Sequence, residues 1–138
     1  MRRFLVALPA ALIAIVAVPV ARAPVRTLRR SWDARVAIEG RSMQPALEPG
    51  DWLLVDPDAY ARRSPESGEL ILAPDPRQTN LLLLKRVGVV DEDGRLQLLG
   101  DAPDASTDSR TFGSIDPATV QGRPWFRYWP LRRAGRVR

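Results

Sequence analysis

Histidine and cysteine are both absent from this chain of 138 residues. Without them, no Ser–His or Cys–His catalytic couple, thiolate nucleophile or ordinary zinc site can form. Disulfide bonds are excluded as well, so cysteine usage gives no indication of the redox compartment. Any nucleophile must therefore be Ser, Thr, Lys or a carboxylate, and any general base must be Lys, Asp, Glu or Tyr. We expect no cofactor.

Lysine is nearly absent too, because 20 of the 21 basic residues are arginines. The single lysine, Lys85, lies in the apolar stretch LLLLKRVGVV, residues 81–90. Since alternate side chains of a strand face the same way, Lys85 would share a face with leucine and valine. Burial there lowers the pKa of the ammonium group, whereas an arginine would stay protonated. Lys85 is therefore either a base or a lysine that extends its amine from a strand edge to water.

The formal net charge is +5, and arginines gather in the C-terminal residues 132–138. A basic segment can bind nucleic acid, but no recognition helix or pattern of stacking aromatic residues accompanies this one. The favoured interpretation is a solvated tail beside a membrane that contains anionic lipids. We expect no nucleic-acid partner.

The longest apolar run covers residues 4–20 and follows two arginines. It is slightly shorter than the ~20 residues that span a bilayer. It is either a membrane anchor or a removable signal peptide, since residues 21–23, Ala-Arg-Ala, have the small-x-small form of a cleavage site. Pro24 lacks an N–H and fixes φ directly after that site, which disfavours cleavage. A retained, single-pass anchor over residues 1–23 is the favoured interpretation.

Short apolar runs separated by turn residues follow, and this pattern predicts a mostly β domain. The expected organisation is a basic linker over residues 24–35, a β-rich domain over residues 36–131 and the tail over residues 132–138. Residues 91–94, Asp-Glu-Asp-Gly, indicate a hairpin turn between two strands. The expected strands cover residues 36–38, 52–55, 70–73, 81–90, 96–99 and 125–129.

A lysine base needs a nucleophile, and Ser42 is the best candidate. It follows an apolar strand and Gly40, and it precedes Met43 and Pro45. A serine at a tight turn can present its hydroxyl outward and its own N–H toward a bound carbonyl, as acyl transfer with an oxyanion site requires. Taken alone, a serine in this setting is more often a turn residue or a helix cap.

Three segments together resemble the signal peptidase I family. GRSMQP at residues 40–45, with Gly50-Asp51 before a strand, is similar to the nucleophile box, and LKRV at residues 84–87 is similar to the lysine box. LGDAPDASTDSRTFG at residues 99–113 is similar to the family's Gly-Asp-Asn…Ser-x-Asp-Ser-Arg box. The resemblance implies an antiparallel β peptidase domain preceded by one N-terminal membrane-anchor helix.

The resemblance also implies a serine–lysine dyad that needs no cofactor. Ser42 would attack the peptide carbonyl, and neutral Lys85 would take its proton and later pass it to the leaving amine. Ser106 matches the family serine that hydrogen-bonds the lysine and orients it. The other supporting residues would be Gly100, Asp101, Asp108 and Arg110.

Two positions depart from the family pattern. Ala102 stands where the family usually has Asn, so one loop hydrogen bond would be lost. Gly40 stands where some members supply a serine hydroxyl, so the oxyanion would rest mainly on the Ser42 N–H. Losing one such donor costs on the order of a hundredfold in rate. Met43 would line the substrate groove, contact the membrane or pack in the core.

The compact chain and its ending indicate a subgroup. GRPWFRYWP at residues 122–130 resembles compact members described as nickel-type superoxide dismutase maturation proteases, which remove a short N-terminal leader. A general signal peptidase would place its domain outside the cytoplasm. Four arginines shortly after the apolar run, against two before it, instead favour a cytoplasmic domain by the positive-inside rule. The side of the membrane and the oligomeric state stay open.

The resulting prediction is a membrane-anchored serine endopeptidase that removes N-terminal leader or signal peptides from precursor proteins. Its partners would be those precursors and membrane lipids. Self-cleaving repressors of the SOS type also pair a Ser-Met strand with a lysine strand, but they carry a DNA-binding domain and lack the third segment. The alternative from another class is a catalytically inactive, β-rich, membrane-associated binding module, with Ala102 and Gly40 as signs of lost catalysis.

Overall fold

The computed structural model describes residues 25–138, so the expected anchor over residues 1–23 lies outside the described part of the chain. Within residues 25–138, no helix is long and apolar enough to cross a membrane.

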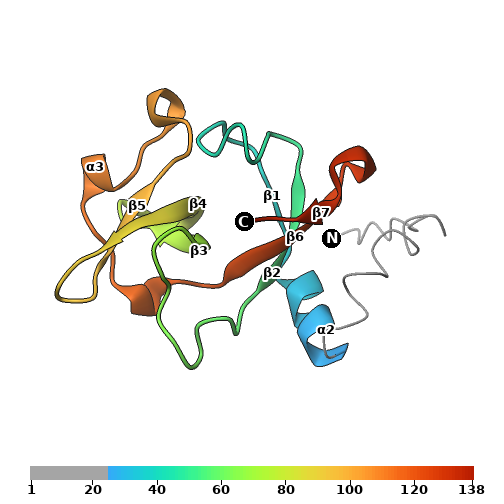
Figure 1. Cartoon of the computed structure of the whole chain (residues 1–138), viewed down its shortest axis with the longest axis horizontal. Helices are drawn as coiled ribbons and strands as arrows, with labels where there is room; N and C mark the ends of the chain where they lie inside the picture. The colour runs from blue at the N-terminus through green and yellow to red at the C-terminus, as the bar shows by residue number, and fades with distance from the viewer. Residues whose placement is uncertain (1–24) are drawn as a thin grey trace.

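The described chain forms two antiparallel sheets, which confirms the mostly β prediction (Figure 1). The larger sheet has the order β1-β2-β6-β7 and the smaller has the order β3-β4-β5. The strands are β1 (Val36–Ala37), β2 (Trp52–Asp56), β3 (Leu70–Asp75), β4 (Gln78–Val90), β5 (Leu96–Leu99), β6 (Arg123–Trp129) and β7 (Gly135–Arg136). The helices are short: α2 (Val25–Asp33), α3 (Ser109–Phe112) and the 3-10 turns η1 (Pro103–Ala105), η2 (Pro117–Thr119) and η3 (Leu131–Arg133).

Six of these strands coincide with the apolar runs of the sequence. The predicted hairpin turn between β4 and β5 is confirmed, since the Asp91 N–H donates to the Arg95 carbonyl at 2.8 Å. Gly94 completes the turn at a φ of 80°, where glycine has no steric penalty. β4 starts earlier than predicted, at Gln78, because a tight hairpin pairs that residue with Asp75 of β3.

Apolar side chains pack on both sheets and between them. One cluster lies on the β3-β4-β5 sheet and contains Ile71, Ala73, Val87, Leu96, Leu98 and Ile115. A second joins the segment around Ser42 to the two sheets and contains Ile38, Met43, Leu47, Leu53 and Leu70. A third, of Leu54, Phe126 and Tyr128, lies on the β2–β6 pair. The two sheets are also joined by main-chain hydrogen bonds, because the Leu72 N–H donates to the Gly122 carbonyl at 2.9 Å.

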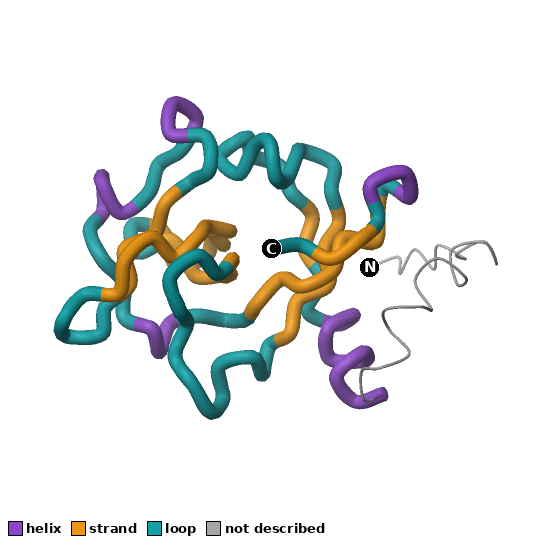
Figure 2. The backbone as a smooth tube through the Cα atoms, in the orientation of Figure 1, coloured by secondary structure: helices purple, strands orange, loops and turns teal. Residues whose placement is uncertain are grey.

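The two basic segments are more ordered than the sequence suggested. The expected linker contains helix α2, whose Trp32 ring lies 5.3 Å from the Tyr128 ring and whose buried Ser31 accepts a hydrogen bond from Trp125 Nε1 at 3.2 Å. The tail was wrongly expected to be solvated throughout. It contains β7, which pairs with the edge of β6, and Val137 packs against the second cluster. Loops, teal in Figure 2, connect the remaining elements.

A buried carboxylate fastens residues 41–51, the segment that contains Ser42, to β6. Asp51 is 1% exposed and accepts hydrogen bonds from Arg127 Nη1 of β6 and from the Glu48 N–H, both at 2.9 Å. Arg127 Nη1 also donates to the Ala46 carbonyl at 3.2 Å. Arg133 pairs with the same carboxylate at 3.4 Å. Arg127 therefore holds residues 41–51 in place, although it follows Asp51 by 76 positions and Ala46 by 81 positions.

We expect Asp51→Ala to lower the free energy of unfolding by about 3 kcal/mol, because it leaves two arginine side chains without their shared buried partner. Asp58→Ala is the matched control, since Asp58 pairs with Arg30 at the surface and its loss should cost less than about 1 kcal/mol. Urea unfolding of both variants measures the difference. Equal losses would show that the Asp51 network does not stabilise the fold.

Candidate active site

Ser42 lies in a turn whose neighbours are anchored in the core. Met43 and Leu47 are 2% and 1% exposed, and the Leu47 N–H donates to the Met43 carbonyl at 2.9 Å. Ser42 itself is only half-buried. Within residues 25–138, its N–H donates to no protein acceptor. The turn therefore leaves both the hydroxyl and the N–H of Ser42 available to a bound molecule.

Lys85 is buried on β4, so its amine does not extend from a strand edge to water. It pairs with Ile71 of β3, is 3% exposed and donates from Nζ to Ser106 Oγ at 3.0 Å. Burial is the main cause that lowers the pKa of Lys85 below its usual 10.5. The carboxylates of Asp108 and Asp75 act in the opposite direction.

Ser106 connects the lysine to a carboxylate that is itself neutralised. The Ser106 hydroxyl donates to Asp108 Oδ2 at 3.0 Å, so its oxygen is left to accept from Lys85. Asp108 is 1% exposed and pairs with Arg110 through two side-chain bonds of 2.9 and 2.7 Å. These contacts hold the pKa of Asp108 well below its usual range, with the Arg110 hydrogen bond as the largest cause. The carboxylate therefore stays an acceptor and fixes the orientation of the Ser106 hydroxyl.

A second arginine–carboxylate pair near the lysine was not foreseen. Asp75, at the end of β3, is 3% exposed and accepts from Arg77 Nε and Nη2 at 2.9 and 2.6 Å. Both groups act on the pKa of Lys85, Asp75 raising it and Arg77 lowering it. The pair itself is local, but its effect on Lys85 follows from the pairing of β3 with β4, which no sequence motif marks.

The third segment, residues 99–113, contacts the turn at Ser42 through its main chain. The Ala102 N–H donates to the Ser42 carbonyl at 2.9 Å. At Gly100, a Cβ would lie 2.1 Å from Ser106 Oγ and 2.7 Å from the Ser42 carbonyl oxygen. Only glycine allows this close approach. The Gly100 N–H also donates to Asp108 Oδ2 at 3.0 Å, so the same carboxylate organises both ends of the segment.

Asp101 holds this segment on the lysine strand. Its carboxylate accepts hydrogen bonds from Arg86 Nε and Nη2 at 2.8 and 2.7 Å, and the two side chains form a bidentate pair. Arg86 follows Lys85 on β4 and points to the other face of the strand, as predicted. It also donates to the Gly68 carbonyl at 2.8 Å. The structure thus brings Ser42, Lys85 and all the predicted supporting residues to one region.

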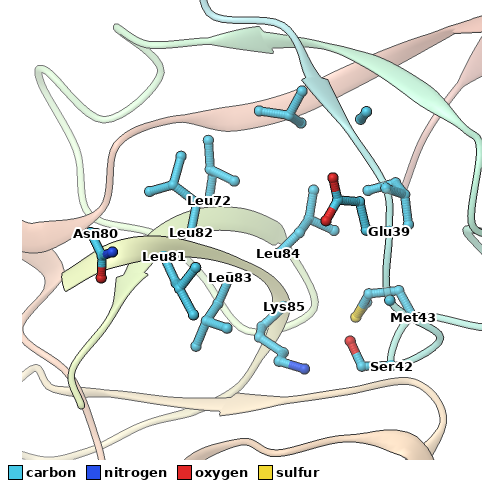
Figure 3. A pocket seen from close by; sticks show the side chains of 14 residues that line it. Glu39, Ser42, Met43, Leu72, Asn80, Leu81, Leu82, Leu83, Leu84 and Lys85 are labelled. Atoms are coloured by element: carbon cyan, nitrogen blue, oxygen red, sulfur yellow. The ribbon is translucent and has the colours of Figure 1, made fainter. Parts of the chain in front are cut away.

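A groove of about 450 Å³ runs past Ser42 and Lys85. Residues 36–40 and the buried Met43 line one side, and residues 80–84 line the other. Met43 is therefore both a core residue and a groove residue; its burial argues against a membrane contact. Figure 3 shows the Lys85 amine directed toward the Ser42 hydroxyl at one end of the groove. Most of the other lining side chains are aliphatic.

Two unpaired strand edges border this groove. β1 pairs only with β2, and β4 pairs with β5 only from Arg86 onward. Residues 80–85 of β4 therefore have one edge free of strand partners within the described chain. Such edges can hydrogen-bond an extended peptide laid between them. Among residues 25–138, no group of acidic side chains is arranged to hold a metal ion.

Comparisons with known proteins identify the family to which this chain is similar. The family described as signal peptidase, peptidase S26, matches residues 4–93. The chain belongs to this family. Mitochondrial inner membrane protease subunit 1 of Xenopus tropicalis is 31% identical over 119 residues, which cover 72% of this chain and 71% of that protein. The ATP-independent inner membrane protease subunit 1b of Arabidopsis thaliana is 29% identical over 118 residues, 70% of each chain.

Membership in this peptidase family confirms the resemblance drawn from the three segments. The family match includes the Ser42 and Lys85 segments. The catalytic roles of these residues stay predictions, as do the supporting roles of the third segment.

We expect Lys85→Met to raise the free energy of unfolding by about 1 kcal/mol at pH 7, because it removes a buried amine that is costly to charge. In the wild type, the unfolded chain binds more protons wherever the pH lies between the lowered pKa and 10.5. Wild-type stability should therefore rise with pH in this range, and the advantage of the variant should shrink. Urea unfolding from pH 6 to 10 tests this. Val89→Met, at an exposed position of the same strand, should instead follow the wild type; a Lys85→Met curve parallel to it would contradict the burial argument.

Proposed function

We propose that this protein is a membrane-anchored serine endopeptidase that removes N-terminal leader or signal peptides from precursor proteins. The observation that carries the proposal is the position of Lys85, whose amine is buried, tied to Ser106 and directed toward Ser42 in an open groove. Family membership supports peptidase activity, and the names of the relatives support an association with a membrane.

In the proposed reaction, neutral Lys85 accepts the proton of the Ser42 hydroxyl as Oγ attacks the carbonyl carbon of the scissile peptide. The resulting oxyanion lies near the Ser42 N–H, which has no acceptor among residues 25–138. Lys85 then gives its proton to the leaving amine as the C–N bond breaks. Lys85 then deprotonates a water, which attacks the ester carbonyl carbon; the bond to Ser42 Oγ breaks, the leader leaves with a new carboxyl group, and Lys85 returns the proton to Oγ.

The hydrogen bond to Ser106 explains how the Lys85 amine can be oriented to accept the proton of Ser42. Because the Ser106 hydroxyl donates to Asp108, Lys85 must donate one N–H to Ser106, and the rest of its amine remains free toward Ser42. A neutral amine can donate this hydrogen bond, so Ser106 can orient Lys85 without requiring that the amine be protonated. An arginine at position 85 could make a similar hydrogen bond, but it could not accept the proton.

The groove has features that suit a leader peptide bound in an extended conformation. The edge at residues 36–40 and the edge at residues 80–85 can both pair with its main chain, and the aliphatic walls suit small apolar side chains. Within this class of substrates, we propose a short leader such as that of nickel-type superoxide dismutase. The compact chain and its GRPWFRYWP ending support this choice over general secretory precursors.

We expect Ser42→Ala and Lys85→Arg each to lower cleavage by at least about a thousandfold, because each removes one half of the dyad. The substrates are an Ala-x-Ala secretory leader and a superoxide dismutase leader, presented to the full chain in detergent. Faster cleavage of the second leader would support the maturation role. Cleavage by Lys85→Arg at the wild-type rate, or no cleavage of any leader by the wild type, would favour the inactive binding module.

Arg110 gives a separate prediction about pH. Arg110→Gln removes a cation that lowers the pKa of Lys85 and leaves the Asp108 carboxylate, which raises it, unneutralised. The rise of the cleavage rate with pH, which follows deprotonation of Lys85, should therefore move to higher pH. The rate near neutrality should fall more than the rate at high pH. Arg95→Gln, which changes an arginine bound to Ser114 outside the site, should leave the profile in place. A uniform loss at every pH would contradict the electrostatic role.

A further inference from the structure

One charged side chain on the groove wall has no part in the proposed reaction. Glu39 lines the groove together with Ser42 and Lys85, and Figure 3 shows its carboxylate turned into this space. Among the residues of the described chain, 25–138, that line the groove, Glu39 and Lys85 are the only ionisable side chains. When Lys85 is neutral, as the reaction needs, Glu39 carries the only charge on the walls.

Glu39 also has no ionic partner within the described chain. None of the ion pairs among residues 25–138 includes it. The two carboxylates that act on the pKa of Lys85, those of Asp108 and Asp75, are each paired with an arginine. The groove therefore presents one acidic side chain without an ionic partner in residues 25–138, although the net charge of the chain is +5.

The alternation of the edge at residues 36–40 indicates which substrate side chain would meet Glu39. Ile38 is buried beside Met43, whereas its two neighbours Ala37 and Glu39 are exposed. An extended peptide beside this edge alternates in the same way. If the residue before the scissile bond points toward Met43, the residue before that one points toward Glu39.

We propose that Glu39 selects substrates with arginine or lysine at the second residue before the scissile bond. This inference rests on the proposed function and names its substrate class: leaders with a cationic side chain between two small ones. A cation at this position forms an ion pair at the groove rim. Such partly exposed pairs change affinity by about twofold to fivefold, so the preference for arginine over glutamate should reach about tenfold when attraction and repulsion combine.

The test measures binding separately from cleavage. Fluorescence anisotropy reports the affinity of the full-length Ser42→Ala protein, in detergent, for labelled leader peptides that carry Arg, Gln or Glu at the second position before the scissile bond. The affinities should follow the order Arg, Gln, Glu. Adding Glu39→Gln should reduce the Arg-over-Glu ratio to about twofold or less, and adding Glu39→Arg should reverse it. Raising the salt from 50 to 500 mM should weaken the preference, since screening acts on exposed pairs.

Two controls make the result specific. Glu66→Gln removes an equal charge from a side chain that is 78% exposed and does not line the groove, so the ratio should stay at its original value. A peptide with arginine moved to the third position before the scissile bond should lose the preference. The inference is overturned if the ratio survives Glu39→Gln, if Glu66→Gln changes it equally, or if no peptide shows a preference.

Cleavage of the Gln peptide by the protein with Ser42 intact separates the two proposals. Cleavage without any charge preference would leave the peptidase assignment standing and reject the role of Glu39. A Glu39-dependent preference in binding, without cleavage by the intact protein, would support the role of Glu39 in a groove that binds peptides but does not cut them.

Discussion

The hydrogen bond from Lys85 Nζ to Ser106 Oγ is the contact on which the rest of the site depends. It can orient the amine only if the Ser106 hydroxyl donates elsewhere, and the buried carboxylate of Asp108 supplies that acceptor. The carboxylate in turn needs Arg110 and the Gly100 N–H to remain ionised while buried. Each of these requirements is met by the short segment after β5, which explains why so many of its residues are polar and why position 100 cannot carry a side chain.

Electrostatics imposes a second requirement, because a buried lysine acts as a base only if its neighbours do not hold its proton. Asp108 and Asp75 both favour the charged amine, and each is paired with one arginine that partly cancels its effect. The abundance of arginine in this chain fits that role well. A guanidinium binds a carboxylate bidentately and stays protonated, so it neutralises the acid without competing for the proton that the lysine must carry. In the proposed mechanism, the one position that must lose its proton is the position of the single lysine.

Much of the fold could be predicted, because the strands are short apolar runs between turn residues, and both Lys85 and Ser42 stood out by residue type and setting. The rest depends on contacts between distant residues. The clamp between Asp51 and Arg127 joins residues 76 positions apart, so no local pattern reveals it. The pairing of β7 with β6 uses a free edge that exists only once the sheet has formed. Asp75 and Arg77 are only two positions apart, but their effect on the pKa of Lys85 follows from the pairing of β3 with β4. The place of Glu39 in the groove depends on the approach of residues 36–40 to residues 80–85.

The two departures from the family pattern have different physical consequences. At position 102 the contact with the nucleophile turn is made by a main-chain N–H, which donates to the Ser42 carbonyl, so loss of an asparagine side chain leaves this link intact. At position 40 a Cβ would meet nothing within 4 Å, so the space for a larger side chain is present. Glycine there is not required by packing. In the proposed mechanism, the oxyanion therefore has the Ser42 N–H but no side-chain donor at position 40, while Lys85 keeps its geometry, and this combination favours slow catalysis over loss of catalysis.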